Sequence, residues 1–237
     1  MPLERYSADE AQKNAFARVL LLGPPKCGKT VACSTTSPRP VDVINCDGKY
    51  AIAPVPLYGK FESGDFEAMN VRCNAEWQAA CREEHARACK GEVRTIVVDS
   101  LTLLADSILD EARQARPGAK LDFDGWSLYA DAVMGHEGRS GLRLLLDAPA
   151  HLIITAHMAP VGDYVAGILP AIPGRVIPNK LPGLIDDWIL FECTTSGERR
   201  FVLGPQDNWN HSGRNIRKVT KIAADVNLLL KELGIDP

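Results

Sequence analysis

The sequence predicts an α/β domain with a mainly parallel, twisted sheet, helices on both faces and a β-hairpin near the C-terminus. Short apolar runs alternate with longer helix-forming stretches up to residue 156. This order is typical of a parallel sheet with crossover helices. The runs are apolar at nearly every position, as in strands that are buried on both faces. After residue 183, two runs joined through Ser196-Gly197 indicate a hairpin.

The elements follow from apolar and β-branched runs and from the turn residues that bound them. The expected strands are residues 16–22, 41–45, 68–71, 95–99, 151–156, 187–192 and 199–203. Helices are expected to end near proline or glycine. They cover residues 28–35, 74–90, 100–115, 126–146 (interrupted at 135–141) and 223–233, with a loop at 121–125.

We expect one domain over residues 1–237. Residues 1–15 form a short polar lead-in, residues 219–234 carry a C-terminal helix, and residues 158–183, with five prolines and four glycines, form a long mobile loop. Hydrophobic content of 46% and charged content of 24% are ordinary for a globular protein. The net charge of −3 provides no general attraction to nucleic acid, so such binding requires a local patch.

The cysteines and the polar N-terminus favour a cytoplasmic protein. Seven cysteines without a C-x-x-C pair do not suggest a secreted disulfide framework and fit a reducing compartment. The first residues lack the apolar core of a signal peptide. No apolar run approaches the roughly 18–20 residues that span a bilayer, so no membrane partner is expected.

Residues 23–30, GPPKCGKT, match the phosphate-loop pattern G-x-x-x-x-G-K-[ST] between a strand and a helix. In such a turn the backbone N–H groups and the positive end of the helix bind phosphate. Lys29 would reach the β- and γ-phosphates, and the Thr30 hydroxyl would hold Mg²⁺. An ordinary strand-to-helix turn is the alternative, and the context on both sides disfavours it. The candidate nucleotide-binding residues are Gly23, Pro24, Pro25, Lys26, Cys27, Gly28, Lys29, Thr30 and Val31.

Three further polar side chains follow predicted strands, namely Asp47, Asp99 and His157. The carboxyl ends of parallel strands lie at one edge of a sheet, where ligands bind. We therefore expect these groups to join Lys29 in a catalytic site. Asp99 would hold Mg²⁺ with Thr30; alternatively, it caps the following helix.

Asp47 would orient or deprotonate the attacking water, and its alternative is a turn aspartate before Gly48. His157 would contact the γ-phosphate and report its loss to the adjacent loop. A lone histidine is more often structural, so this role depends on its position after the fourth strand of the alternating pattern.

Several cysteines have chemical alternatives. Cys27 lies at the predicted helix N-terminus, which would lower its pKa, so we expect its alkylation to block nucleotide binding and ATP to protect it. Cys81, His85 and Cys89 recur at four-residue spacing and share one helix face. Zinc would need a fourth ligand, such as Cys73, and rarely takes three from one helix. The pattern therefore favours ordinary helix residues.

The segments GPPKCGKT, VINCDGK, TIVVDSLTLL and HLIITAHM, in this order and spacing, resemble the RecA-type ATPase core. They are most similar to the compact phage single-strand annealing ATPases, which are often grouped with AAA-type proteins. The resemblance implies a RecA-like P-loop fold, ATP and Mg²⁺ as cofactors, and DNA-stimulated hydrolysis. It also implies a ring or filament on single-stranded DNA, a recombination partner such as a single-strand-binding protein, and a phage protein in the host cytoplasm.

The resemblance also implies roles for individual residues. Asp47 takes the position of a catalytic glutamate in RecA relatives but is one methylene shorter. His157 takes the position of the polar γ-phosphate sensor. The loop over residues 159–182 corresponds to a mobile DNA-binding loop, in which the candidate contacts are Tyr164, Arg175 and Lys180. A plain surface loop or a lid over substrate remains the alternative.

The basic stretch over residues 210–221 could supply a cation to a neighbouring subunit's γ-phosphate. The candidates are Arg214, Arg217 and Lys218, and Lys221 lies in the same stretch. The alternative is a solvated basic turn.

Two other functions remain open. A P-loop kinase would use Asp47 to bind or deprotonate a small acceptor, with the proline-rich loop as a lid. A non-hydrolysing switch would use ATP binding only to set assembly. DNA-stimulated turnover would support the recombination ATPase, and a requirement for an acceptor would support the kinase. Tight nucleotide binding without turnover would support the switch.

Overall fold

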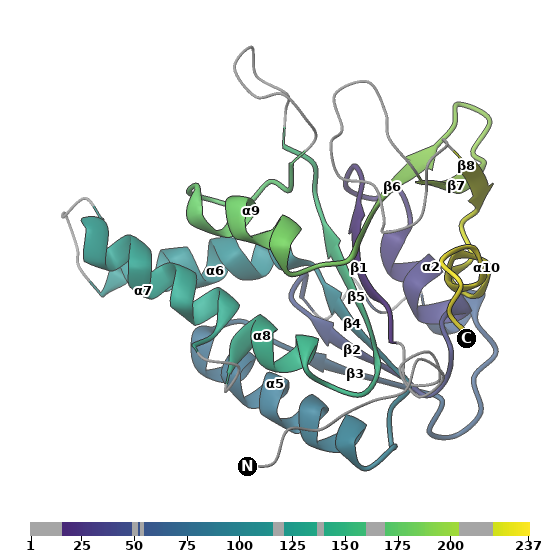
Figure 1. Cartoon of the computed structure of the whole chain (residues 1–237), viewed down its shortest axis with the longest axis horizontal. Coiled ribbons are helices and arrows are strands. Elements are labelled where there is room, and N and C mark those ends of the chain that lie inside the picture. Colours follow the sequence, from purple (N-terminus) through teal and green to yellow (C-terminus); the bar gives the residue numbers. More distant parts are fainter. Residues whose placement is uncertain are drawn as a thin grey trace.

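The computed structural model describes residues 16–48, 52, 55–115, 121–136, 140–159, 169–203 and 220–237. Within these residues the strands form one eight-stranded sheet in the order β3-β2-β4-β5-β1-β6-β7-β8. Helices cover both of its faces (Figure 1). The expected mainly parallel α/β architecture is therefore confirmed.

The strands from β3 to β6 in this order are mutually parallel, whereas β7 and β8 are antiparallel to their neighbours. The predicted hairpin is formed by β6 and β7. The strands are β1 (Arg18–Leu22), β2 (Val41–Asn45), β3 (Phe66–Asn70), β4 (Thr95–Asp99), β5 (His151–Ala156), β6 (Asp187–Cys193), β7 (Arg199–Leu203) and β8 (Thr220–Ala223).

Nine helical segments lie within the described residues. They are α2 (Lys29–Thr36), α4 (Val55–Tyr58), α5 (Asn74–Cys89), α6 (Leu101–Gln114), α7 (Phe123–Met134), α8 (Gly141–Leu146), α9 (Val176–Lys180), the 3₁₀ turn η1 (Leu181–Gly183) and α10 (Val226–Glu232). None of these described helices is long and apolar enough to cross a membrane.

Two apolar clusters hold the helices against the sheet. Helices α5, α6, α7 and α8 pack on one face, where Trp77 is fully buried and its indole N–H donates to the Val133 carbonyl at 3.1 Å. Helices α2 and α10 cover the other face, above Phe191 and Phe201 (Figure 1). Burial of these large side chains supplies the main favourable term in folding.

Several expected boundaries were wrong. Residues 220–223, which fall within the expected helix region 219–234, pair with β7 as a strand, and α10 begins only at Val226. Helix α7 begins at Phe123 inside the expected loop, because the Asp122 side chain caps it by accepting from Gly125 N at 2.8 Å. The expected loop over 158–183 contains α9 and η1 in its described part.

Candidate nucleotide-binding site

The sequence-predicted polar groups meet at one edge of the sheet. Strands β2, β4, β5 and β1 are consecutive neighbours. Their register pairs Asn45 with Asp99, and Leu22 with Ala156. The residues that follow β2, β4, β5 and β1 therefore emerge side by side at the carboxyl edge, where α/β proteins bind ligands.

The loop between β1 and α2 has the backbone of an anion-binding turn. Lys26 and Gly28 both have left-handed backbones, with φ of 60° and 102°. Successive N–H groups in such turns converge on one point. Gly23 lies against β6, since a Cβ there would sit 2.9 Å from the Phe191 carbonyl oxygen. The loop is therefore packed on the hairpin at one end and opens into α2 at the other.

The Lys29 side chain lies inside this loop. It is only 6% exposed, and its Nζ donates to the carbonyl oxygens of Gly23 at 2.9 Å and Pro24 at 2.8 Å. A buried ammonium requires such oxygen partners. Phosphate oxygens offer the same kind of acceptor with a full negative charge, so the environment of Lys29 fits an anion.

Asp99 is held between two hydroxyl groups. It is 2% exposed, its Oδ2 accepts from Thr30 Oγ1 and its Oδ1 accepts from Thr155 Oγ1, both at 2.5 Å. Burial raises the pKa of Asp99, while the hydroxyl bonds and the nearby Lys29 oppose that rise. The alternative of a capping aspartate is wrong, because Ser100 occupies the N-cap of α6.

Asp47 lies beside Asp99. Its Oδ1 accepts from the backbone N of Ser100 at 3.1 Å and from the Ser100 hydroxyl at 3.0 Å. Its own backbone N donates to the Asn45 side chain at 3.2 Å. These bonds connect the end of β2 to the start of α6 and fix the position of the carboxylate.

His157 follows β5 at the same edge, and its backbone N donates to the Thr102 hydroxyl at 2.9 Å. Burial and the Lys29 ammonium lower the pKa of His157 below its ordinary value. The carboxylates of Asp47, Asp99 and Asp106 oppose this shift. The imidazole is therefore neutral near pH 7.

The model of the AAA domain family matches residues 15–186. This range is more than half of the chain and contains the phosphate loop, Asp47, Asp99 and His157. The chain belongs to this AAA domain family.

Solved structures also resemble this AAA domain. A KaiC-like protein from the hyperthermophilic archaeon Pyrococcus horikoshii OT3 shares 13% identity at a TM-score of 0.49, over 93% of this chain and 94% of that one. A prototypical ATPase from the type III secretion system of pathogenic bacteria shares 12% identity at a TM-score of 0.50. That match covers 74% of this chain and 51% of the secretion ATPase, so the AAA domain spans about half of its length. A comparison with curated proteins gave no match.

The family and the architecture together support a nucleotide-binding ATPase with a RecA-like P-loop fold. The low identity to the secretion ATPase limits that likeness to the fold. The finer role of this AAA domain therefore depends on its own residues.

The expectation that the helix N-terminus lowers the pKa of Cys27 was wrong. Cys27 is 7% exposed, and burial raises the pKa of its thiol even though Lys29 opposes the rise. Cys81 is fully buried in α5, whereas Cys89 is exposed with its Sγ 3.8 Å from His85 Nδ1. The described residues contain no group of three or more histidine, cysteine or acidic side chains arranged for a metal.

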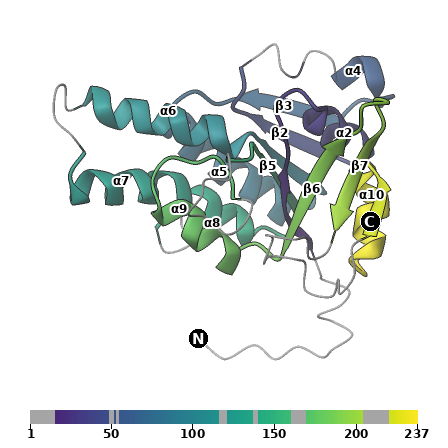
Figure 2. The same cartoon turned by 90° about the horizontal axis from the view of Figure 1, so that it is seen from above.

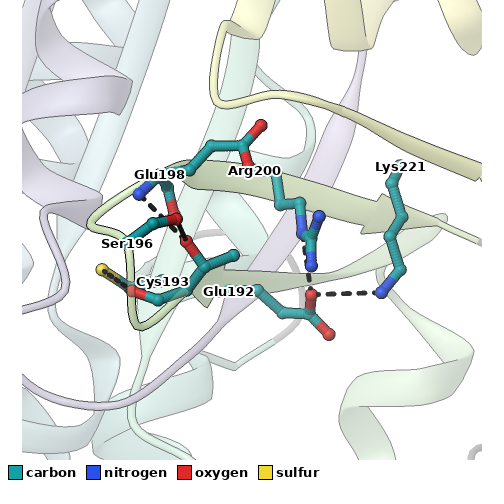
Figure 3. Close-up of polar contacts among 7 residues, drawn as sticks. Glu192, Cys193, Ser196, Glu198, Arg200 and Lys221 are labelled. Carbon is teal, nitrogen blue, oxygen red and sulfur yellow. Dashed lines mark hydrogen bonds and ion pairs between the residues drawn. The ribbon is translucent and has the colours of Figure 1, made fainter.

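The predicted DNA contacts are only partly described. Arg175 and Lys180 are exposed at the two ends of α9, which packs on α7. Tyr164 lies outside the described residues, as do the proposed trans cations Arg214, Arg217 and Lys218. Lys221, from the same basic stretch, pairs within the chain with Glu192 at 3.4 Å (Figure 3).

Two residues that position the site were missed by the sequence reasoning. Thr155 donates to Asp99 from the next-to-last position of β5, and Ser100, with which the expected helix over 100–115 begins, also donates to Asp47. A polar residue inside an otherwise apolar buried strand could have identified Thr155. Its partner is 56 residues away in sequence, so the pairing itself required the sheet order.

Proposed function

We propose that this AAA domain binds Mg²⁺-ATP at the carboxyl edge of the sheet and hydrolyses it. We further propose that it acts as an oligomer on single-stranded DNA, in phage-type recombination or annealing. The observation that carries the ATPase proposal is the convergence of Lys29, the Thr30–Asp99 pair and Asp47 beside a loop with an anion-binding backbone.

Lys29 is the phosphate-binding cation in this proposal. Its present partners are two carbonyl oxygens of its own loop, and phosphate oxygens would replace them. A lysine beside a P-loop acts on the β- and γ-phosphates in this way.

Thr30 and Asp99 would hold Mg²⁺, because hydroxyl and carboxylate oxygens are the hard ligands that this ion prefers. Bound Mg²⁺ would neutralise negative charge on the phosphates. The Thr155 hydroxyl fixes the second oxygen of Asp99 and thereby orients the carboxylate.

Asp47 would position the attacking water. Ser100 occupies Oδ1 with two hydrogen bonds, whereas Oδ2 accepts none from the residues that the structure describes. Oδ2 is therefore the oxygen that can accept a proton from water. The neutral imidazole of His157 would donate an N–H to the γ-phosphate and lose that contact after hydrolysis.

One observation also favours the non-hydrolysing switch. The two hydrogen bonds from Ser100 hold Oδ1 of Asp47 against the start of α6, which restricts the movement of this short side chain toward an attacking water. In that case ATP binding would set assembly without turnover. Asp47→Asn distinguishes the two, because it removes turnover from an ATPase but changes nothing measurable in a switch that has none.

The DNA-binding proposal rests on the resemblance stated from the four motifs and on the exposed cations of α9. Arg175 and Lys180 would neutralise phosphates near the loop that follows His157. Two cations bind weakly in one subunit, so repetition along an oligomer would supply the affinity.

A binding experiment tests this proposal. Fluorescence anisotropy would measure the affinity of a labelled single strand with and without Mg²⁺-ATP, for the natural chain and for an Arg175→Ala, Lys180→Ala double variant. Tighter binding with ATP, weakened in the double variant and by added salt, supports the DNA role. No binding to single strands at low salt would refute it while leaving nucleotide binding intact.

A further inference from the structure

We infer that Arg199, in β7, binds the phosphates of the nucleotide from the same chain as the phosphate loop. This inference rests on the proposed nucleotide binding and adds a cation that lies outside the loop motif. It identifies the ligand class as a nucleoside di- or triphosphate.

The guanidinium of Arg199 lies directly on the phosphate loop. A Cβ built on Gly28 would sit 2.9 Å from Arg199 Nε and 3.0 Å from its Cζ. Gly28 is the second glycine of the motif and the N-cap of α2. Any side chain at this position would displace the arginine, so the bare glycine leaves room for the close contact.

The hairpin that carries Arg199 packs on the loop at other points as well. Cys193 pairs with Arg199 across the hairpin and lies within electrostatic range of the Cys27 thiol in the loop. Gly23 lies against Phe191 in β6. Figure 2 shows β6 and β7 side by side at the end of the sheet that α10 covers. Arg199 is therefore placed by a rigid, hydrogen-bonded element.

The positive charge around Arg199 favours binding of an anion. Its side chain is exposed and makes no hydrogen bond or ion pair with any residue that the structure describes. It lies at the positive end of α2, whose first turn contains no acidic residue, next to the buried Lys29. Like charges at a helix N-terminus repel, and a bound anion relieves that repulsion.

The next residue in the strand shows the contrast. Arg200 Nε lies 3.0 Å from Glu192 Oε2, which Lys221 also approaches at 3.4 Å (Figure 3). Successive strand residues point to opposite faces of a sheet. Of these two adjacent arginines, one is thus neutralised within the chain while the other rests on the phosphate loop.

The position of Arg199 also predicts its kinetic effect. The backbone around Gly28 is the part of a P-loop that cradles the α- and β-phosphates, which ADP and ATP share. Guanidinium groups bind such oxygens in a bidentate manner. Arg199 therefore strengthens binding of both nucleotides equally, and its loss raises KM with little change in kcat. A cation supplied in trans would instead change kcat and depend on protein concentration.

The test is titration of dilute protein with Mg²⁺-ADP and Mg²⁺-ATP by calorimetry. We expect Arg199→Ala to weaken both nucleotides by about 10- to 100-fold, as for loss of a charge-assisted hydrogen bond. Arg199→Lys should recover part of that loss. The matched control Arg200→Ala should stay within about twofold of the natural chain, because its charge is already paired with Glu192.

The possible outcomes separate this inference from the proposed function. If the natural chain binds nucleotide and Lys29→Ala does not, but Arg199→Ala binds as well as Arg200→Ala, Arg199 has no role in binding. If the natural chain binds neither nucleotide, the proposed function itself is refuted. Thermal unfolding of Arg199→Ala without nucleotide shows whether this variant has a folding defect. If it has one, Arg199→Gln, which keeps a polar side chain without the charge, replaces it and must show the same loss of nucleotide affinity.

Discussion

Glu84→Gln tests the physical reasoning most sharply, because it removes a carboxyl group buried beside another one. Glu84 in α5 is 0% exposed and Asp42 in β2 is 2% exposed. Arg87 Nη1 lies 2.5 Å from Asp42 Oδ2 but 3.7 Å from Glu84 Oε1. One guanidinium therefore serves two buried carboxyl groups, with Asp42 as its nearer partner.

The size of the expected pH effect on the free energy of unfolding follows from proton linkage. Burial raises the pKa of Glu84 from 4.5 to about 9, and the neighbouring Asp42 adds to the rise. The folded state thus favours the protonated form of Glu84. The stability that this protonation contributes is complete below about pH 4.5 and is lost as pH rises through about 9. One proton gives a slope of about 1.4 kcal/mol per pH unit, hence about 3 kcal/mol between pH 6 and 8.

Urea unfolding at several pH values measures this slope. We expect the free energy of unfolding of the natural chain to fall between pH 6 and 8 relative to Glu84→Gln. The glutamine amide is neutral at every pH and keeps a hydrogen-bond donor beside Asp42. Glu83→Gln, at an exposed neighbouring position, is the control and should follow the natural chain. Parallel curves for Glu84→Gln and the natural chain would refute the reasoning.

Three further predictions concern the nucleotide site. Asp99→Asn should reduce Mg²⁺-dependent turnover by about 10- to 100-fold, because an amide nitrogen replaces one of the two carboxylate oxygens; turnover near the natural rate would contradict this. Thr155→Val should lower the free energy of unfolding at pH 7 by about 1.5–3 kcal/mol, as for a lost bond to a charged group, and urea unfolding with no change would refute it. A maleimide should label exposed Cys89 and Cys193 before buried Cys27, with Mg²⁺-ATP slowing Cys27 further; peptide mapping that finds Cys27 labelled first would contradict this.

Much of the site could be predicted because local sequence and parallel topology agree. Strand β4 matches the expected residues 95–99 because its apolar, β-branched run ends on Asp99. Strands β2 and β5 also matched their expected residues, and polar residues lie at or just after their carboxyl ends. Once these strands are parallel neighbours, their ends must share one edge. The sequence therefore predicted that Asp47, Asp99 and His157 share an edge, and the sheet order added that their strands are consecutive neighbours.

The features that sequence could not supply depend on contacts between distant residues. Arg199 rests on Gly28, which lies far before it in the chain. Strand β8 has only four half-exposed or exposed residues, and it exists because β7 offers a free edge for pairing. The expected low pKa of Cys27 considered only the helix N-terminus, which lowers the pKa. Burial of the thiol raises the pKa and is the larger effect. In each case tertiary packing outweighed the local pattern.

The central claim is that this AAA domain is an ATPase that acts on single-stranded DNA. Its most direct test is Mg²⁺-ATP hydrolysis by the purified protein, with and without single-stranded DNA, at two salt concentrations. We predict turnover that DNA stimulates, that weakens at the higher salt because phosphate contacts are screened, and that vanishes in Lys29→Ala. Hydrolysis that is unchanged by DNA would contradict the DNA role, and rates equal in Lys29→Ala and the natural chain would contradict the nucleotide site itself.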